Sequence, residues 1–117
     1  MVGGSAARDY AGRVDGRFDP MQPWIDPATR IPPADLAQAL DLYDGEIAAV
    51  DAAIGRLVAR LEELGRGDET LVIVTSDHGE EFRDHGSFGH GHSLYEETVR
   101  VPLVVRGRGV ATRCAVS

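Results

Sequence analysis

The sequence contains no lysine and only one cysteine, and these two absences exclude several kinds of site. All 12 basic residues are arginine, against 19 acidic residues, so the formal net charge is -7. Binding nucleic acid through a basic surface requires clustered lysine and arginine to displace counterions from phosphates, and no such cluster occurs. Cys114 has no partner for an intrachain disulfide or a thiolate metal cluster. We therefore expect no nucleic-acid partner and no cysteine-based metal site.

Long apolar runs are also absent. No stretch approaches the roughly 20 apolar residues that cross a bilayer, and the opening residues MVGGSAARDY lack the apolar core of a signal peptide. We therefore expect no membrane contact and, by default, a cytoplasmic location. With 117 residues, 43% of them hydrophobic, the chain has the size of one small domain with a modest core. These features leave the oligomeric state open.

Residues 1–33 are rich in proline and predict a connector loop. X-Pro steps such as Asp26-Pro27 favour extended backbone and remove amide donors. A structureless loop this long is unusual inside a compact small domain, so we assign 1–33 as a connector and 34–117 as a partial α/β domain. Four apolar side chains of the connector are expected to dock against a larger body: Phe18, Met21, Trp24 and Ile25.

Residues 34–64 have the apolar periodicity of one long helix, with aliphatic residues and a tyrosine recurring at spacings of three and four. Pro33 suits the first helical turn and Gly65 suits the position just past the end, while Gly45 allows a break or bend. The same period fits a coiled-coil seam. We favour packing against a sheet over self-association because a strand follows directly.

Two short apolar runs predict strands, TLVIVT at 70–75 and VPLVV at 101–105. Continuous apolarity in the first run indicates burial on both faces, as in a central strand, and Pro102 confines the second to a strand start or an edge. Helix, strand, polar loop and strand is an α/β order, and in open α/β sheets ligands bind where strands end. These elements are too few to cover a buried sheet, so we expect the fold to be incomplete on its own.

The loop after the first strand begins with Asp77 and His78, which are candidate metal ligands. Gly79 permits a sharp turn and close approach of a ligand, so that the carboxylate and the imidazole can face one cation. Oxygen ligands suit Ca²⁺ and Mg²⁺, and mixed oxygen and nitrogen sets suit Mn²⁺ and Zn²⁺. The alternative, on the dipeptide alone, is that Asp77 caps the turn and His78 is a surface residue.

All four histidines fall between positions 78 and 92. His90 and His92 alternate with Gly89 and Gly91, so in an extended segment both rings point the same way and can chelate a metal, bind an anion or act as a general acid. Asp84 and His85 are candidate partners of these groups, and Arg100 is a candidate partner for an acid. Four acids are interpreted as solvated loop charges: Glu80, Glu81, Glu96 and Glu97.

Two runs, LYDGEIAAVDAAIGRLVARLEELGRGDETLVIVTSDHGEE and FGHGHSLYEETVRVPLVVRG, resemble the middle-to-late catalytic domain of sulfatases, in the alkaline-phosphatase-like superfamily. The resemblance covers about residues 40–109 and implies a partial alkaline-phosphatase-like sandwich. It implies that Asp77 and His78 bind a divalent cation, usually Ca²⁺. It also implies that a basic residue shortly before YEETVRVP contacts the sulfate or the leaving-group oxygen. Without lysine, that catalytic and substrate-binding role falls to His92 or His90.

The family's nucleophile comes from a Cys/Ser-x-Pro-x-Arg motif that is absent here, and Cys114 does not lie in one. We therefore interpret the chain as a segment of a sulfatase-like hydrolase of small sulfate esters, inactive when isolated. The alternatives within the superfamily are a phosphonate or phosphodiester hydrolase and a phosphoglycerol transferase, which act on phosphate esters. A third interpretation is a noncatalytic fragment whose helix dimerises or whose histidines bind metal.

Overall fold

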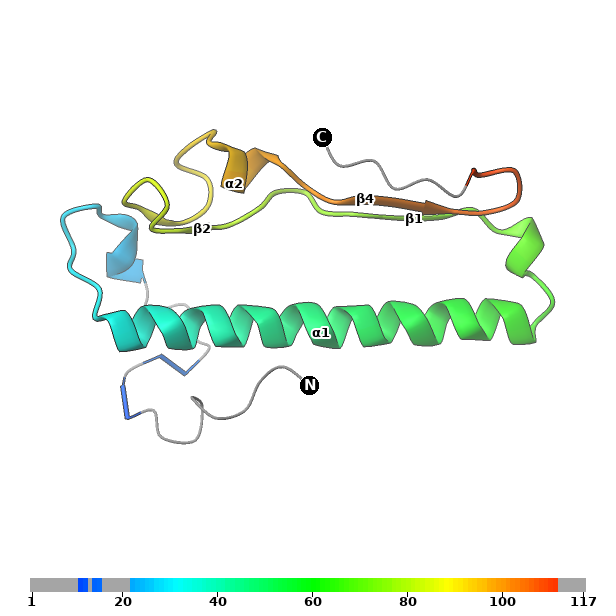
Figure 1. The fold of residues 1–117 in the computed structure, drawn as a ribbon, viewed down its shortest axis with the longest axis horizontal. Coiled ribbons are helices and arrows are strands. Elements are labelled where there is room, and N and C mark those ends of the chain that lie inside the picture. The colour runs from blue at the N-terminus through cyan, green and yellow to red at the C-terminus, as the bar shows by residue number, and fades with distance from the viewer. Residues whose placement is uncertain (1–10, 13, 16–21, 112–117) are drawn as a thin grey trace.

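One long helix organises the structure. The computed structural model describes the following residues of the chain: 11–12, 14–15 and 22–111. Helix α1 spans Pro33–Glu63 and runs through Gly45 without a break (Figure 1). Just past its end Gly65, with a φ of 67°, lets the amides of Gly65 and Arg66 bond back to the last helical carbonyls. The predicted helix is confirmed, and no described helix combines the length and apolarity needed to cross a membrane.

In the described part of the chain, four strands form two small antiparallel pairs. β1 (Val72–Thr75) pairs with β4 (Leu103–Arg106), and β2 (Glu81–Phe82) pairs with β3 (Phe88–Gly89). Pro102 immediately precedes β4, as predicted for a strand start. Three short helical segments are also present: η2 (Gln22–Ile25) before α1, η3 (Gly67–Glu69) before β1, and α2 (Glu96–Val99) before β4. This mixed helix and strand content confirms the α/β class.

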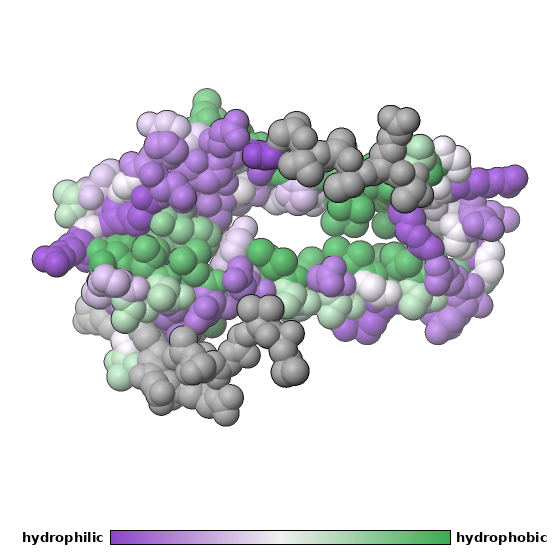
Figure 2. Space-filling model, viewed as in Figure 1, coloured by the Kyte–Doolittle hydropathy of each residue, from purple (hydrophilic) through white to green (hydrophobic). Residues whose placement is uncertain are grey.

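The apolar surfaces of α1 and of the β1–β4 pair face one another without closing a core. α1 runs alongside the pair (Figure 1), and an ion pair between Glu62 and Arg106 joins them at one end. Figure 2 shows open space between the two apolar surfaces, and Ile47, Ile73 and Leu103 are 53%, 56% and 70% exposed. The burial on both faces that the first apolar run predicts is not observed, because no described element covers these strands.

The buried core lies near the N-terminal end of α1 and consists of Val14, Trp24, Ala39 and Phe88. The Trp24 ring meets the Phe88 ring edge-on, with their centroids 5.0 Å apart. Trp24 therefore docks as predicted, whereas Ile25 stays at the surface. The two other apolar residues expected to dock lie outside the described residues: Phe18 and Met21. Because Phe88 belongs to β3, this core anchors the β2–β3 hairpin.

Replacing Phe88 with alanine should lower the free energy of unfolding by about 3–5 kcal/mol, the usual cost of truncating a buried phenylalanine. Leu94 is 87% exposed, so Leu94→Ala is a control expected to change stability by less than about 0.5 kcal/mol. Urea unfolding followed by the fluorescence of Trp24, the single tryptophan, measures both. Equal effects of the two variants would contradict the assigned core.

Candidate metal and histidine site

The loop that leaves β1 turns sharply at Ser76 to Gly79. The Ser76 hydroxyl donates to the His78 carbonyl at 2.6 Å, and the Gly79 amide donates to the Thr98 carbonyl at 2.8 Å. A Cβ at residue 79 would lie 2.0 Å from the Glu97 carbonyl oxygen, so only glycine allows this approach of the loop to α2. The turn breaks the strand geometry and brings the neighbouring side chains of Asp77 and His78 together.

Asp77 and His78 are arranged so that they can share one cation. The His78 Nδ1 lies 2.8 Å from the Gly79 carbonyl, which only accepts, so this nitrogen carries the proton and Nε2 keeps its lone pair in the neutral ring. That Nε2 is 3.8 Å from Asp77 Oδ2, a separation compatible with metal–ligand bonds of about 2.0–2.6 Å to both atoms. The donor set therefore fits a divalent cation.

The charge of Asp77 also suits a ligand. Hydrogen bonding from its own backbone amide, the proximity of His78 and a hydrogen bond from the His78 amide lower the pKa of the Asp77 carboxyl below its ordinary value. The capping contact proposed as the alternative is present too, because Asp77 Oδ1 accepts from the His78 amide at 3.1 Å. One carboxylate oxygen caps the turn, and Oδ2 remains for a cation.

His90 lies directly against His78. Its ring stacks on the ring of His78, with centroids 3.8 Å apart and planes inclined by 28°. Its Nδ1 lies 3.1 and 3.2 Å from the two carboxylate oxygens of Glu80. Nε2 of His90 makes no hydrogen bond with the residues that the structure describes, so it is available to a ligand.

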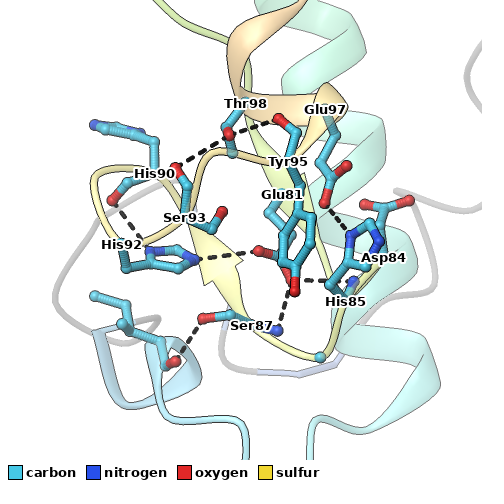
Figure 3. A network of polar contacts seen from close by, with 12 residues as sticks. Glu81, Asp84, His85, Ser87, His90, His92, Ser93, Tyr95, Glu97 and Thr98 are labelled. Atoms are coloured by element: carbon cyan, nitrogen blue, oxygen red, sulfur yellow. Dashed lines mark hydrogen bonds and ion pairs between the residues drawn. The ribbon is translucent and has the colours of Figure 1, made fainter.

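His92 has a different environment, although it is only two residues away. Its Nε2 lies 3.2 Å from Oε2 of Glu81, and its Nδ1 lies 3.3 Å from the carbonyl oxygen of His90 (Figure 3). Both ring nitrogens of His92 therefore face acceptors within the chain. The structure brings His90, and not His92, into contact with His78.

Glu81 is a buried charge, and the expectation that it is solvated is wrong. It is fully excluded from solvent, and its Oε1 accepts from the amides of Ser87 at 2.6 Å and His85 at 3.2 Å. Burial raises the pKa of Glu81, but the hydrogen bonds from the Ser87 amide, the His92 ring and the His85 amide outweigh burial and hold the pKa below its ordinary value. Glu81 is thus a carboxylate inside the hairpin.

The remaining predicted polar residues hold the loops around the site. His85 Nδ1 lies 2.6 Å from Glu97, and the His85 ring stacks on Tyr95 with centroids 3.6 Å apart. Asp84 accepts from the Phe82 amide at 3.1 Å within the hairpin. Of the four acids expected to be solvated, Glu96 is exposed as predicted and pairs with Arg100 at 3.7 Å; the other three pair with histidines: Glu80, Glu81 and Glu97.

Sequence reasoning missed Glu81 and Arg83. Arg83 has a φ of 75°, and its guanidinium donates to the carbonyls of Gly86 and Thr29, which ties the hairpin to the loop after η2. No periodicity marks this arginine. The hairpin register, with Phe82 opposite Phe88 and Glu81 opposite Gly89, places Glu81 against the histidine segment.

Within the described ranges, no group of three or more histidine, cysteine, aspartate and glutamate side chains could hold a metal ion. Asp77 and His78 therefore account for two ligands at most, and a complete site requires further donors. Asp77 and His78 thus form a pair that could contribute two ligands, and the ring of His90 stacks on that of His78.

Comparison with known proteins identifies the class. An acid–histidine loop at a strand end in a mixed α/β fold is consistent with the alkaline-phosphatase-like superfamily. The Sulfatase family profile matches residues 3–115, and the chain therefore belongs to the sulfatase family.

Three curated relatives illustrate the relationship. The chain is similar to the multifunctional alkaline phosphatase superfamily protein PehA of Trinickia caryophylli, with 41% identity over 76 residues, covering 64% of this chain and 14% of that protein. Arylsulfatase K of Bos taurus is 39% identical over 75 residues, covering 64% of this chain and 14% of that protein. N-acetylglucosamine-6-O-sulfatase of Bacteroides thetaiotaomicron is 42% identical over 64 residues, covering 55% of this chain and 11% of that protein. The chain thus spans at most 14% of the length of these relatives.

Gly79→Ala should push the loop away from α2, because the added Cβ meets the Glu97 carbonyl and the bond from residue 79 to Thr98 must lengthen. Amide hydrogen exchange at residue 79 is expected to accelerate. Gly45→Ala is the control, because a Cβ added at residue 45 would meet nothing within 4 Å. The higher helix propensity of alanine should stabilise the folded chain by about 1 kcal/mol. Unchanged protection in Gly79→Ala would contradict the close approach.

Stability contributed by Glu81 should decline in acid. A carboxylate whose pKa is lower in the folded than in the unfolded chain stabilises fully above the unfolded value, and this contribution is lost as pH falls through the folded value. The difference in unfolding free energy between the unmodified chain and Glu81→Gln should therefore shrink as the pH falls below the ordinary glutamate pKa of about 4.3. The corresponding difference for Glu96→Gln should stay near zero throughout, and an identical pH profile for both variants would refute the assignment.

Proposed function

We propose that this chain supplies the metal-binding and leaving-group end of the active site of a sulfate-ester hydrolase. The observation that carries the proposal is the stacking of His90 on His78, beside Asp77, in a chain of the sulfatase family. Two of the relatives carry sulfatase in their names, arylsulfatase K and N-acetylglucosamine-6-O-sulfatase. A small sulfate ester is therefore the substrate class that we assign.

In this proposal Asp77 Oδ2 and His78 Nε2 hold a divalent cation, for which Ca²⁺ is our first choice and Mn²⁺, Mg²⁺ or Zn²⁺ are alternatives. When bound, such a cation supplies neutralisation of charge on the sulfuryl oxygens. The Gly79 carbonyl supports this role, because it holds the proton of His78 on Nδ1 and leaves Nε2 free to ligate.

His90 is the residue to which we assign contact with substrate, in preference to His92. Its Nδ1 is held by Glu80, and when the ring is doubly protonated its Nε2 can donate to the sulfate or give its proton to the departing oxygen as a general acid. Both ring nitrogens of His92 are engaged within the chain, which supports a structural role for that residue.

The nucleophile is proposed to come from outside these 117 residues, because the sequence has no Cys/Ser-x-Pro-x-Arg motif. We therefore propose that residues 34–117 form a partial catalytic domain, that 1–33 form a connector to it, and that the isolated chain does not turn over substrate. Docking of Trp24 onto Phe88 supports the connector assignment.

A phosphonate or phosphodiester substrate is a second candidate, favoured by the 41% identity to PehA, a protein named for the alkaline phosphatase superfamily. Phosphoryl oxygens present the same negative charge to a cation and to an imidazole. A chimera in which this chain replaces the matching segment of PehA separates the candidates. Comparison of its rates on an aryl sulfate and on an aryl phosphodiester identifies the preferred ester.

Asp77→Ala in this chimera should abolish both metal retention and turnover, because it removes the only carboxylate of the ligand pair. Metal content measured by atomic emission after desalting, together with ester hydrolysis, reads out both properties. Asp84→Ala is the control, since Asp84 bonds the Phe82 amide within the hairpin, and it should retain the metal. A full metal complement in Asp77→Ala would overturn the ligand assignment.

A further inference from the structure

We infer that Glu81 is a positioning residue, which sets His90 against His78 by holding both the His92 ring and the turns on either side of β3. The inference rests on the proposed role of His90. It gives a function to a fully buried carboxylate that the proposed chemistry does not otherwise use.

The contacts of Glu81 come from both sides of β3. Oε1 accepts from the amides of His85 and Ser87, which precede the strand, and Oε2 lies 3.2 Å from the ring of His92, which follows it. A buried carboxylate left without donors would be strongly destabilising. The hairpin conformation that satisfies Glu81 is therefore the one in which these turns close around it, as Figure 3 shows.

His92 carries this constraint to His90. Its second ring nitrogen, Nδ1, lies 3.3 Å from the His90 carbonyl oxygen. A carboxylate and a carbonyl both accept, so both contacts are hydrogen bonds only when both ring nitrogens carry protons. In that state His92 is an imidazolium that offsets the Glu81 charge and fixes the peptide after His90.

The backbone around His90 needs such a restraint. Gly89 and Gly91 flank it with φ values of 92° and 84°, a region that glycine enters and leaves at little cost. The chain of contacts from Glu81 through His92 to the His90 carbonyl removes this freedom. The ring of His90 can then keep one position, stacked on His78 and held by Glu80. Of the other titratable groups nearby, His85 and Glu97 are paired with each other, and Asp84 accepts from the Phe82 amide.

Nuclear magnetic resonance of the full 117-residue chain with ¹⁵N-labelled histidine rings tests the bridge without requiring turnover. His92 should carry a proton on Nε2, the nitrogen that faces Glu81, and cross-relaxation should connect the rings of His78 and His90. Glu81→Gln should change the His92 ring signals and abolish the contact between His78 and His90. Glu80→Gln, a change of the adjacent acid that pairs with His90 instead, should leave the His92 ring signals unchanged.

His92→Gln tests the same bridge from its other side, since an amide keeps a donor toward Glu81 but replaces the ring that reaches the His90 carbonyl. It should also abolish the contact between the rings of His78 and His90. Persistence of that contact in both variants, or four histidines with indistinguishable ring signals in the unmodified chain, would overturn the inference.

Kinetics of the PehA chimera separate this inference from the proposed function. Glu81→Gln should lower kcat by about 10- to 100-fold with little change in KM, the effect of a misplaced catalytic group. Combined with His90→Gln, it should cause no further loss, because Glu81 acts through His90. Additive losses would contradict positioning. If His90→Gln alone leaves kcat unchanged, the proposed function fails, while the spectroscopic result still decides whether Glu81 holds His92.

Discussion

A buried carboxylate sets the conditions under which the functional loop of this chain folds. Glu81 has no exposure to solvent, so the loop must deliver donors to it or bear the cost of an unpaired interior charge. The amides of His85 and Ser87 and the ring of His92 meet that requirement. Because those donors are spread along the segment that carries His90, satisfying one charge orders the whole segment.

Directional polar contacts matter more here because apolar burial is limited. Four described apolar residues are buried, whereas Ile47, Leu57 and Leu71 are each more than half exposed. Hydrophobic stabilisation scales with the apolar area removed from water, so the exposed stripe of α1 contributes little. Trp24 and Phe88 secure one end of the hairpin, and hydrogen bonds secure the rest. Substitutions that preserve shape but remove charge, such as Glu81→Gln, are therefore informative.

The helix α1 and the strands β1 and β4 could be predicted from the sequence because local rules determine them, whereas the short strands β2 and β3 were not predicted. Apolar spacing, Pro33 and Gly65 delimit α1 almost to the residue, and Pro102 marks the start of β4. The pairing of acids with histidines could not be predicted in the same way. Glutamate is rarely buried unless it is paired, and the partner of Glu81 depends on the β2–β3 register, which two-residue strands specify weakly. The sequence located the histidine cluster without assigning roles within it.

The hydrogen bonds of the ring nitrogens distinguish the histidines from one another. An imidazole acts on a ligand through a nitrogen that the protein leaves free, and His78, His90 and His92 differ in that respect. His78 commits Nδ1 to a backbone carbonyl and His90 commits Nδ1 to Glu80, so each keeps Nε2. His92 commits both nitrogens. In our proposal, the hydrogen bonds that occupy both nitrogens of His92 also restrain the two glycines beside His90, so that His92 sets the position of His90 relative to His78.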